Sequence, residues 1–550
     1  MIIQKGGVIL VGILTAAGIC MFALSISLLN RRAVRKKQKI YLEEKFGTVP
    51  PDIEFNENIR NYYETFVDTP GVDDITWNDL SMDAVFCRIN QCDTSAGEEL
   101  LYAQLRKGQL SDTEYRQLER KIKAAEKEED RLDIERELMK IGKYRGSYFI
   151  PSYMDALEEY RMKHTWLYQT LQILFFAALI FFFIIPGTVT STLLCTVFGV
   201  NLVLYAVLKM RYEVELQMVG TAVDMLRHGR QLVKKEVVAD LYPELKKSLR
   251  ALQNVTRSVT LLQSQKNGGF SGDVFGILLD YILGVTMWQI VTYNKVIKKL
   301  CKDIEDYMIV YRSIGELDMA VSIASFRESV PWYCIPEFQD KKIIDMKEIY
   351  HPLLEQPVEN SLFLERGCII TGSNASGKST FIKAVAVCAI LAQSIHTCTA
   401  GEMKLPKCQV ITSMSVKDDL FAGESYFIRE IKYLKRILDS LSEEKTTLCV
   451  VDEILRGTNT GERIRASMAI LKYLYDKNCI AFVATHDREL TELLADEYEN
   501  YHFSEEIGDE DIYFSYKIQK GPSVSQNAIK LLEFADFPKE IIEKAKEVIG

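Results

Sequence analysis

The sequence predicts an α/β domain at the C-terminal end of a largely helical chain that carries three apolar segments. Residues 372–380 form a glycine-rich loop that lies between an apolar strand and an apolar helical run. After Pro331, short apolar strands alternate with helical runs, which is typical of a mainly parallel sheet. The apolar segments, residues 6–29, 166–185 and 190–208, are each long enough to span a bilayer.

Length and composition limit the classes of protein to which this chain can belong. Its 550 residues are too many for one ordinary core, so we expect two or three domains. The net charge of −9 lacks the basic footprint of a constitutive nucleic-acid binder. The 12 cysteines are scattered without a C-x-x-C pair, which indicates reduced thiols and excludes a disulfide framework or zinc site.

Residues 1–39 are predicted to be an N-terminal transmembrane anchor with a basic flank. The apolar run at 6–29 is followed at once by the basic stretch RRAVRKKQK at 31–39. A cleaved signal peptide would carry its charges before a shorter apolar core. We therefore expect the N-terminus to lie outside and the basic flank to lie in the cytoplasm. The alternative, a nucleic-acid-binding stretch, is less favoured by this position.

Residues 40–165 are soluble in character and are predicted to be the first part of a helical core. Ser111 and Glu114 have the spacing of a capping box, in which the two residues satisfy each other's free N–H groups at the start of a helix. The charged stretch after them predicts a long helix with a solvated face.

Residues 166–209 predict a transmembrane hairpin. The connector between its two apolar runs, Pro186-Gly187, is uncharged, whereas basic residues flank both outer ends. Both ends should therefore face the cytoplasm, as should everything that follows. Because no acidic or basic residue lies inside the three apolar segments, they predict anchors and not an ion pathway. The expected location is the cell membrane, with several spans and a cytoplasmic C-terminal domain. The flanking basic residues are Arg161, Lys163, Lys209 and Arg211.

Residues 210–330 show long amphipathic helical patterns and predict the second part of the helical core. Within them, residues 275–291 are apolar enough to suggest a fourth span, but Asp280 and two glycines interrupt the run. A central aspartate costs about 2.5–3.5 kcal/mol in a bilayer, which favours a buried helix. Association of this segment with the membrane remains the open alternative.

Residues 331–550 form the predicted α/β domain, whose glycine loop has the G-x-x-x-x-G-K-S form of a phosphate-binding P-loop. Its glycines let successive N–H groups face one anion, and the helix N-terminus adds the positive end of its dipole. Lys378 should reach the β- and γ-phosphates, and the Ser379 hydroxyl should ligate Mg²⁺. The alternative is a tight turn without a nucleotide. The residues predicted to hold the triphosphate of ATP are Gly372, Ser373, Asn374, Ala375, Ser376, Gly377, Lys378, Ser379 and Thr380.

Two further apolar strands end in polar residues that suit ATP hydrolysis. Residues 448–453 end in Asp452, which should hold Mg²⁺ with the loop serine, and Glu453, which should polarise the attacking water. Residues 481–486 end in Thr485 and His486, which puts an imidazole where it could sense the γ-phosphate. A lone histidine is often structural, but its position at the next strand end favours a functional role.

Four motifs in order resemble the ATPase domain of the MutS mismatch-repair family over roughly residues 345–550. They are the glycine loop, DDLFAGESYF at 418–427, DEILRGTNT at 452–460 and the Thr-His pair at 485–486. The resemblance implies a P-loop NTPase fold of the ABC/MutS type and Mg²⁺-dependent ATP hydrolysis. It implies Mg²⁺ ligation by Ser379 and Asp452, and a homodimer in which Ser425 acts on the nucleotide of the other subunit. The implied catalytic residues are Lys378, Glu453, His486 and Ser425.

A weaker resemblance to the same family extends upstream. Residues 82–86 and 94–97 resemble the start of the family's helical core, and residues 212–328 resemble its lever helices. The chain departs from the family by starting with an apolar segment where the mismatch-reading domain would stand. Ser373, Ala375 and Ser376 also replace the Pro, Met and Gly of bacterial repair proteins. DNA binding is therefore an open expectation.

Three hypotheses follow from the sequence. The leading one is a membrane-anchored, dimeric MutS-like ATPase that uses ATP to switch its helical region, with binding of mismatched or branched DNA still to be tested. The second is a membrane scaffold on which ATP controls the docking of an unknown protein partner, without DNA. The third is an ABC-type transport ATPase. Three uncharged segments make a poor transport pathway, and Arg-Gly-Thr at 456–458 favours the MutS type.

Overall fold

The computed structural model describes residues 33–547 apart from gaps at 52–53, 69–70, 155–156, 160, 254, 256–283, 374–375, 415–425, 508–511 and 524–536. The expected N-terminal span, residues 275–283, Asn374, Ala375 and Ser425 lie outside the described residues. The chain divides into two compact units. Unit 1 comprises residues 1–48, 92–98 and 124–321, and unit 2 comprises residues 49–91, 99–123 and 322–550.

Unit 1 is helical throughout its described residues. Helix α11 packs against α7, α13 and α16 and forms the centre of this unit. Its buried face carries small and medium apolar side chains such as Ala222, Met225 and Leu226. Residues 33–45 are also helical. Helix α17 belongs to unit 2 from Ser322 onward. The further helices with described bounds are α7 (Glu128–Ile141), η2 (Arg145–Phe149), α8 (Ile150–Met154), α9 (Thr165–Ile184), α10 (Thr188–Arg211), α11 (Glu213–Leu232), α12 (Glu236–Leu241), α13 (Pro243–Ala251), α16 (Trp288–Leu300) and α17 (Ile304–Ser329).

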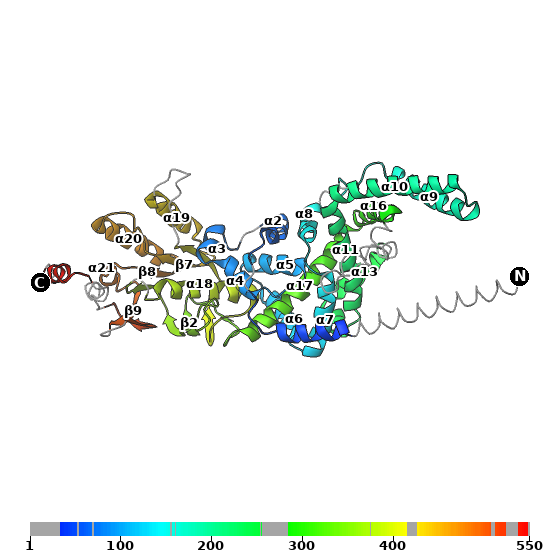
Figure 1. Ribbon diagram of the computed structural model, residues 1–550. Helices are drawn as coiled ribbons and strands as arrows, with labels where there is room; N and C mark the ends of the chain where they lie inside the picture. Colours follow the sequence, from blue (N-terminus) through cyan, green and yellow to red (C-terminus); the bar gives the residue numbers. More distant parts are fainter. Residues whose placement is uncertain are drawn as a thin grey trace. The chain divides into compact units, whose positions relative to one another are not determined.

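Helices α9 and α10 pack side by side as a hairpin, as Figure 1 shows. Both are long and apolar enough to cross a membrane, and only 6% and 22% of their most apolar windows are buried within the protein. Large apolar side chains such as Ile173, Phe183 and Val203 are mostly exposed. A third helix of sufficient length and apolarity, α18 (Lys378–Ile395), is 83% buried and forms part of the α/β domain.

The described end of residues 275–291 is buried against this hairpin. Asn201 of α10 donates a hydrogen bond from Nδ2 to the carbonyl of Val285 at 2.8 Å. The Tyr205 hydroxyl donates to Gln289 at 2.6 Å. Val285 and Ile290 are almost completely buried. The described part of this segment, residues 284–291, is thus buried against α10, and the choice between a buried helix and a membrane-associated segment stays a prediction.

Unit 2 contains two sheets. The larger has six strands in the order β10-β9-β4-β8-β7-β6, with all neighbours parallel except β10 and β9. The smaller has four strands in the order β1-β5-β2-β3. The strands are β1 (Glu337–Phe338), β2 (Ile344–Ile349), β3 (Asn360–Leu364), β4 (Cys368–Thr371), β5 (Glu402–Leu405), β6 (Cys408–Ser413), β7 (Thr446–Asp452), β8 (Cys479–Ala484), β9 (Glu499–Ile507) and β10 (Ile512–Lys520).

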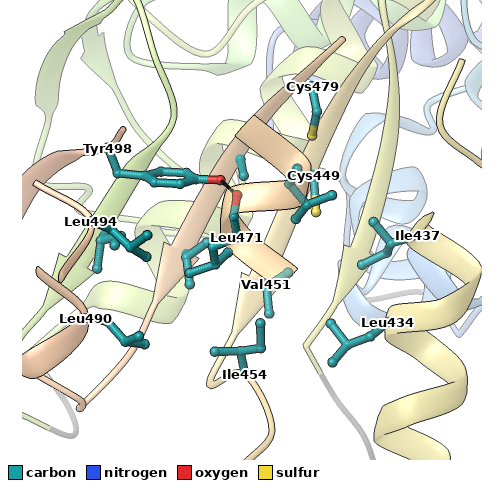
Figure 2. Close-up of a cluster of buried hydrophobic side chains, with 14 of the residues drawn as sticks. Leu434, Ile437, Cys449, Val451, Ile454, Leu471, Cys479, Leu490, Leu494 and Tyr498 are labelled. Carbon is teal, nitrogen blue, oxygen red and sulfur yellow. Dashed lines mark hydrogen bonds between the residues drawn. The ribbon is translucent and has the colours of Figure 1, made fainter. Parts of the chain in front are cut away.

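An apolar cluster joins the larger sheet to the helices that follow β6, β7 and β8. Strand residues such as Cys449 and Val451 pack with Leu434, Leu471 and Leu490 of the three helices (Figure 2). The Tyr498 hydroxyl donates to the Leu471 carbonyl at 2.7 Å, so its one polar atom in this cluster is satisfied. The helices are α19 (Tyr426–Ser440), α20 (Thr460–Tyr475) and α21 (Glu489–Leu493), and α23 (Lys539–Glu547) lies near the C-terminus.

Residues 49–91 and 99–123 belong to the same unit as the α/β domain. Asp79 of α3 accepts a hydrogen bond from the Thr412 hydroxyl of β6 at 2.7 Å, and both side chains are buried. The predicted capping box is present, because Ser111 N–H donates to the Glu114 carboxylate and Glu114 N–H donates to the Ser111 hydroxyl. The helices of these residues are η1 (Glu57–Arg60), α2 (Asn61–Phe66), α3 (Asp74–Asp79), α4 (Met82–Ile89), α5 (Ser95–Lys107) and α6 (Asp112–Ala125).

Candidate active site

Three sequence motifs meet at one edge of the larger sheet. In the parallel register, Ile370 of β4 lies opposite Ala484 of β8, and Ala484 lies opposite Asp452 of β7. The glycine loop follows β4, Thr485 and His486 follow β8, and Glu453 follows β7. Because the carboxyl ends of neighbouring parallel strands meet at one edge, the sheet assembles a candidate site there.

The backbone of the glycine loop requires glycine at two positions. Gly372 has φ +146° and Gly377 has φ +104°, where side chains are rarely accommodated. A Cβ atom on Gly372 would also lie 2.6 Å from the Phe503 carbonyl oxygen, which is an impossible contact. Gly377 is the N-cap of α18 and no side chain caps this helix, so its first N–H groups are available to an anion.

The Lys378 ammonium group is held inside the loop. Its Nζ donates to the carbonyl oxygens of Gly372 and Ser373, each at 2.7 Å. Burial lowers the pKa of Lys378, whereas the negative charges of Asp452, Glu453 and Glu505 act in the opposite direction. Lys378 is 5% exposed, so this side chain is a buried cation near three carboxylates. A buried charge of this kind suits an anionic ligand.

Ser379 and Asp452 lie close enough to bind one cation. Ser379 is exposed, and its hydroxyl lies near the Asp452 carboxylate. Burial raises the pKa of Asp452, and the Ser379 hydroxyl opposes this shift. The described residues contain no group of three or more acidic, histidine or cysteine side chains positioned around a metal. One hydroxyl and one carboxylate fit Mg²⁺, which usually keeps several waters and takes phosphate oxygens as ligands.

The Glu453 carboxylate is held between two donors. His486 Nε2 lies 2.9 Å from Glu453 Oε1, and Arg456 Nε lies 2.9 Å from Glu453 Oε2. The hydrogen bond with His486 lowers the pKa of Glu453, which keeps the carboxylate ionised at neutral pH. Glu453 also has φ +58°, and Leu455 has φ +56°. Such left-handed backbone at non-glycine residues is costly and clusters at functional sites.

Glu430 of α19 stabilises this turn. Its carboxylate accepts hydrogen bonds from the backbone N–H of Arg456 at 2.8 Å and of Gly457 at 3.3 Å. Burial raises the pKa of Glu430, and these two hydrogen bonds oppose the shift. Because Glu430 is 3% exposed, its contacts fix the backbone that carries Glu453 and Arg456.

A second contact stabilises the segment after β8. Arg463 of α20 forms a bidentate pair with Asp487, with distances of 2.7 and 2.5 Å. The Asp487 N–H donates to the Thr485 hydroxyl at 3.1 Å. These bonds hold the residues on either side of His486.

The sequence prediction missed several of these contributors. Glu505 of β9 accepts a hydrogen bond from the Ser373 hydroxyl at 2.8 Å, although 132 positions separate the two residues. Arg456 lies inside a recognised motif and could have been found there, whereas Glu430 and Glu505 carry no local signal. The structure brings together Ser373, Lys378, Ser379, Asp452, Glu453 and His486, while Asn374, Ala375 and Ser425 lie outside its description.

Comparisons with known proteins concern the C-terminal part of the chain. Residues 368–550 match the family model described as MutS domain V. The chain is 33% identical over 279 residues to "MutS protein homolog 4" of Homo sapiens, a match that covers 47% of this chain and 29% of that protein. It is 32% identical over 267 residues to "DNA mismatch repair protein MutS" of Acetivibrio thermocellus, which covers 46% of this chain and 30% of that protein.

The matches therefore span about 30% of the length of these relatives. The ends of β4, β7 and β8 and the turn after β7 all lie within the matched residues. The C-terminal part of this chain is thus similar to proteins of the MutS family, in the region of their domain V.

Proposed function

We propose that this chain is a membrane-anchored MutS-like ATPase that hydrolyses ATP with Mg²⁺ at the edge of the six-stranded sheet. The observation that carries the proposal is the register Ile370–Ala484–Asp452, since it brings the glycine loop, His486 and Glu453 to one edge. Similarity to MutS domain V over residues 368–550 supports the same assignment. The dimer and the role of Ser425 on the nucleotide of the other subunit are part of this proposal.

The glycine loop would bind the triphosphate. The uncapped N–H groups of α18 and the buried Lys378 ammonium supply positive charge at the same place. Lys378, which donates to the carbonyls of Gly372 and Ser373, would donate to the phosphates when they are bound. Ser379 and Asp452 would hold Mg²⁺. When bound, this ion would neutralise part of the phosphate charge.

Glu453 would orient and activate the attacking water. Its lowered pKa keeps it in the ionised form that can accept a proton. One of its oxygens already accepts a hydrogen bond from His486, and the other forms an ion pair with Arg456. A water must therefore share one of these oxygens, which couples the reactivity of Glu453 to the positions of both donors.

The exposed apolar hairpin of α9 and α10 supports the membrane part of the proposal. A soluble protein would gain about 25 cal/mol per Å² by burying such surface, and a bilayer supplies that burial. Basic residues at both outer ends favour a cytoplasmic position for them. The helical region would then be the part that changes with the nucleotide state, and mismatched or branched DNA is its candidate ligand.

Substitution of the loop lysine tests the assignment of the ATP site. The full chain in detergent should hydrolyse ATP in the presence of Mg²⁺, and Lys378→Ala should lower the rate by at least about 100-fold, because a charge contact to the transferred phosphate is lost. The matched control is Lys435→Ala, whose side chain is 70% exposed in a surface pair with Asp439. It should leave the rate unchanged. Full activity of Lys378→Ala would reject the assignment.

A further inference from the structure

Two cysteines face each other at an isolated bridge in unit 2. The Cys334 N–H donates to the Cys398 carbonyl at 3.0 Å, and the Cys398 N–H donates to the Cys334 carbonyl at 2.9 Å. Residues that exchange both hydrogen bonds across an antiparallel pair have Cα atoms about 5.5 Å apart. This separation lies within the range of about 4.4–6.8 Å that a disulfide requires.

The two thiols also lie near each other. The neighbouring Cys398 thiol lowers the pKa of Cys334. Cys334 is partly exposed, whereas Cys398 is completely buried. The pair thus combines a thiol that solvent can reach with a buried thiol directly behind it, which is the arrangement of an oxidant-sensitive cysteine and its resolving partner.

A second pair of neighbouring thiols provides an internal comparison. Cys449 of β7 and Cys479 of β8 lie on neighbouring strands, and the Cys479 thiol raises the pKa of Cys449. Both lie in the apolar cluster of Figure 2 and both are buried. Proximity is therefore common to the two pairs, and exposure to solvent distinguishes Cys334.

We propose that Cys334 and Cys398 are a redox-sensitive site at which peroxide forms a reversible disulfide. The Cys334 thiolate attacks one peroxide oxygen, so that an S–O bond forms, the O–O bond breaks and the leaving hydroxide is protonated to water. The Cys398 sulfur then attacks the Cys334 sulfenic acid. An S–S bond forms, the S–O bond breaks, and the hydroxide leaves as water with the proton of Cys398. Two thiols and one hydrogen peroxide thus give one disulfide and two waters.

The position of the pair gives the disulfide a structural consequence. Cys334 follows the end of α17, and Cys398 follows the end of α18, the helix that begins in the glycine loop. Within unit 2, Arg327 of α17 already donates to the Thr397 hydroxyl and the His396 carbonyl, each at 3.0 Å. A disulfide would add a covalent link between the segments that follow these two helix ends. The link would last until the disulfide is reduced.

Peptide mapping after oxidation tests the proposal. The full chain in detergent is treated with graded hydrogen peroxide, remaining thiols are alkylated, and the digested peptides are identified by mass spectrometry. We expect a linked Cys334–Cys398 peptide that dithiothreitol removes, while Cys449 and Cys479 are recovered as alkylated thiols from the same sample. In Cys398→Ser, dimedone should trap Cys334 as the sulfenic acid, and in Cys334→Ser the Cys398 thiol should stay reduced.

Three outcomes would overturn the proposal. Cys334 could remain a thiol at peroxide doses that oxidise other cysteines, or it could pass to the sulfonic acid without a linked peptide. A link from Cys334 to Cys388, whose side chain also contacts Cys398, would show that the resolving thiol is wrongly assigned. These results are read from the unmodified sequence, so they do not depend on the folding of any variant or on ATP hydrolysis.

Discussion

At the scale of single residues, Glu453 links the backbone strain of the candidate site to its chemistry. Its left-handed conformation turns the chain directly after β7, and the Glu430 carboxylate accepts hydrogen bonds from the N–H groups of Arg456 and Gly457 in this turn. The carboxylate is thereby placed between His486 and Arg456. A residue keeps such a rarely populated backbone conformation only where the surrounding structure holds it there.

A buried carboxylate in unit 1 makes a separate residue-scale prediction. Glu135 of α7 is 2% exposed, and its Oε2 atom has no hydrogen-bond partner among the described residues. Burial, together with the negative charge of Asp93, raises the pKa of Glu135 to about 8, against 4.5 for the unperturbed side chain. The folded state therefore binds a proton that the unfolded state releases, so stability from this group is lost as pH rises from about 4.5 to about 8.

Glu135→Gln should remove this dependence because glutamine cannot ionise. The expected gain in the free energy of unfolding is about 1–3 kcal/mol at pH 8 and close to zero at pH 5. Thermal unfolding of the full chain in detergent across this pH range measures the difference. A variant whose stability tracks the wild type at every pH would contradict the raised pKa.

Glu137 on the same helix provides the matched control. Although burial acts against it, hydrogen bonds from His228 and Lys140 lower the pKa of Glu137 to about 2. Its contribution to stability is therefore present above pH 4.5 and is lost only as pH falls toward 2. Glu137→Gln should thus destabilise the protein by a similar amount, about 1–2 kcal/mol, at both pH 5 and pH 8.

At the scale of secondary structure elements, local patterns predicted the strands that carry the site. Strand β7 is an apolar run that ends at Asp452, and β8 is an apolar run that ends directly before Thr485. The capping box at Ser111 and Glu114 was equally readable, because its partners are three positions apart. Each of these features depends on residues that are close together in the sequence.

Contacts between distant residues could not be predicted in this way. The bond from Ser373 to Glu505 depends on which strand lies beside β4, and no pattern within β9 specifies that neighbour. The grouping of residues 49–91 with the α/β domain rests on contacts such as Asp79 with Thr412, which are 333 positions apart. A pattern in a single sequence shows which face of a helix or strand is apolar. It does not show which other element packs against that face.

The hairpin of α9 and α10 makes a prediction that the native cysteines can test. Cys195 of α10 is exposed in the structure, so a water-soluble maleimide should label it in detergent-free solution if no bilayer covers it. If α10 spans the membrane, Cys195 in sealed vesicles should resist labelling, because a thiol in hydrocarbon neither ionises nor meets the reagent.

A cysteine in the connector serves as the control for vesicle labelling. No atoms lie within 4 Å of a Cβ added at Gly187, so Gly187→Cys should be tolerated and should react with reagent on the outer side. Rapid labelling of Cys195 in intact vesicles would contradict the predicted span.

At the scale of the whole molecule, binding measurements test the DNA part of the proposed function. The net charge of −9 argues against strong non-specific DNA binding. The full chain should be titrated with matched, mismatched and branched duplexes at several salt concentrations. If its function involves DNA, we expect tighter binding to a mismatched or branched duplex and a steep fall of log K with log salt.

The absence of binding even at low salt would contradict the DNA part of the proposal. It would favour the second hypothesis, an ATP-controlled scaffold at the membrane for a protein partner. Because ATP hydrolysis is measured separately, this outcome would leave the assignment of the ATP site intact.

The most direct test of the central claim compares binding and hydrolysis of ATP in Glu453→Gln. Glutamine preserves the size of the side chain but cannot accept the proton of the attacking water. We predict that the variant binds ATP with Mg²⁺ as tightly as the wild type and that its single-turnover hydrolysis is slower by at least about 100-fold. Glu497→Gln, at a half-buried position paired with Lys472, should behave as the wild type does. Hydrolysis by Glu453→Gln at the wild-type rate would contradict the account.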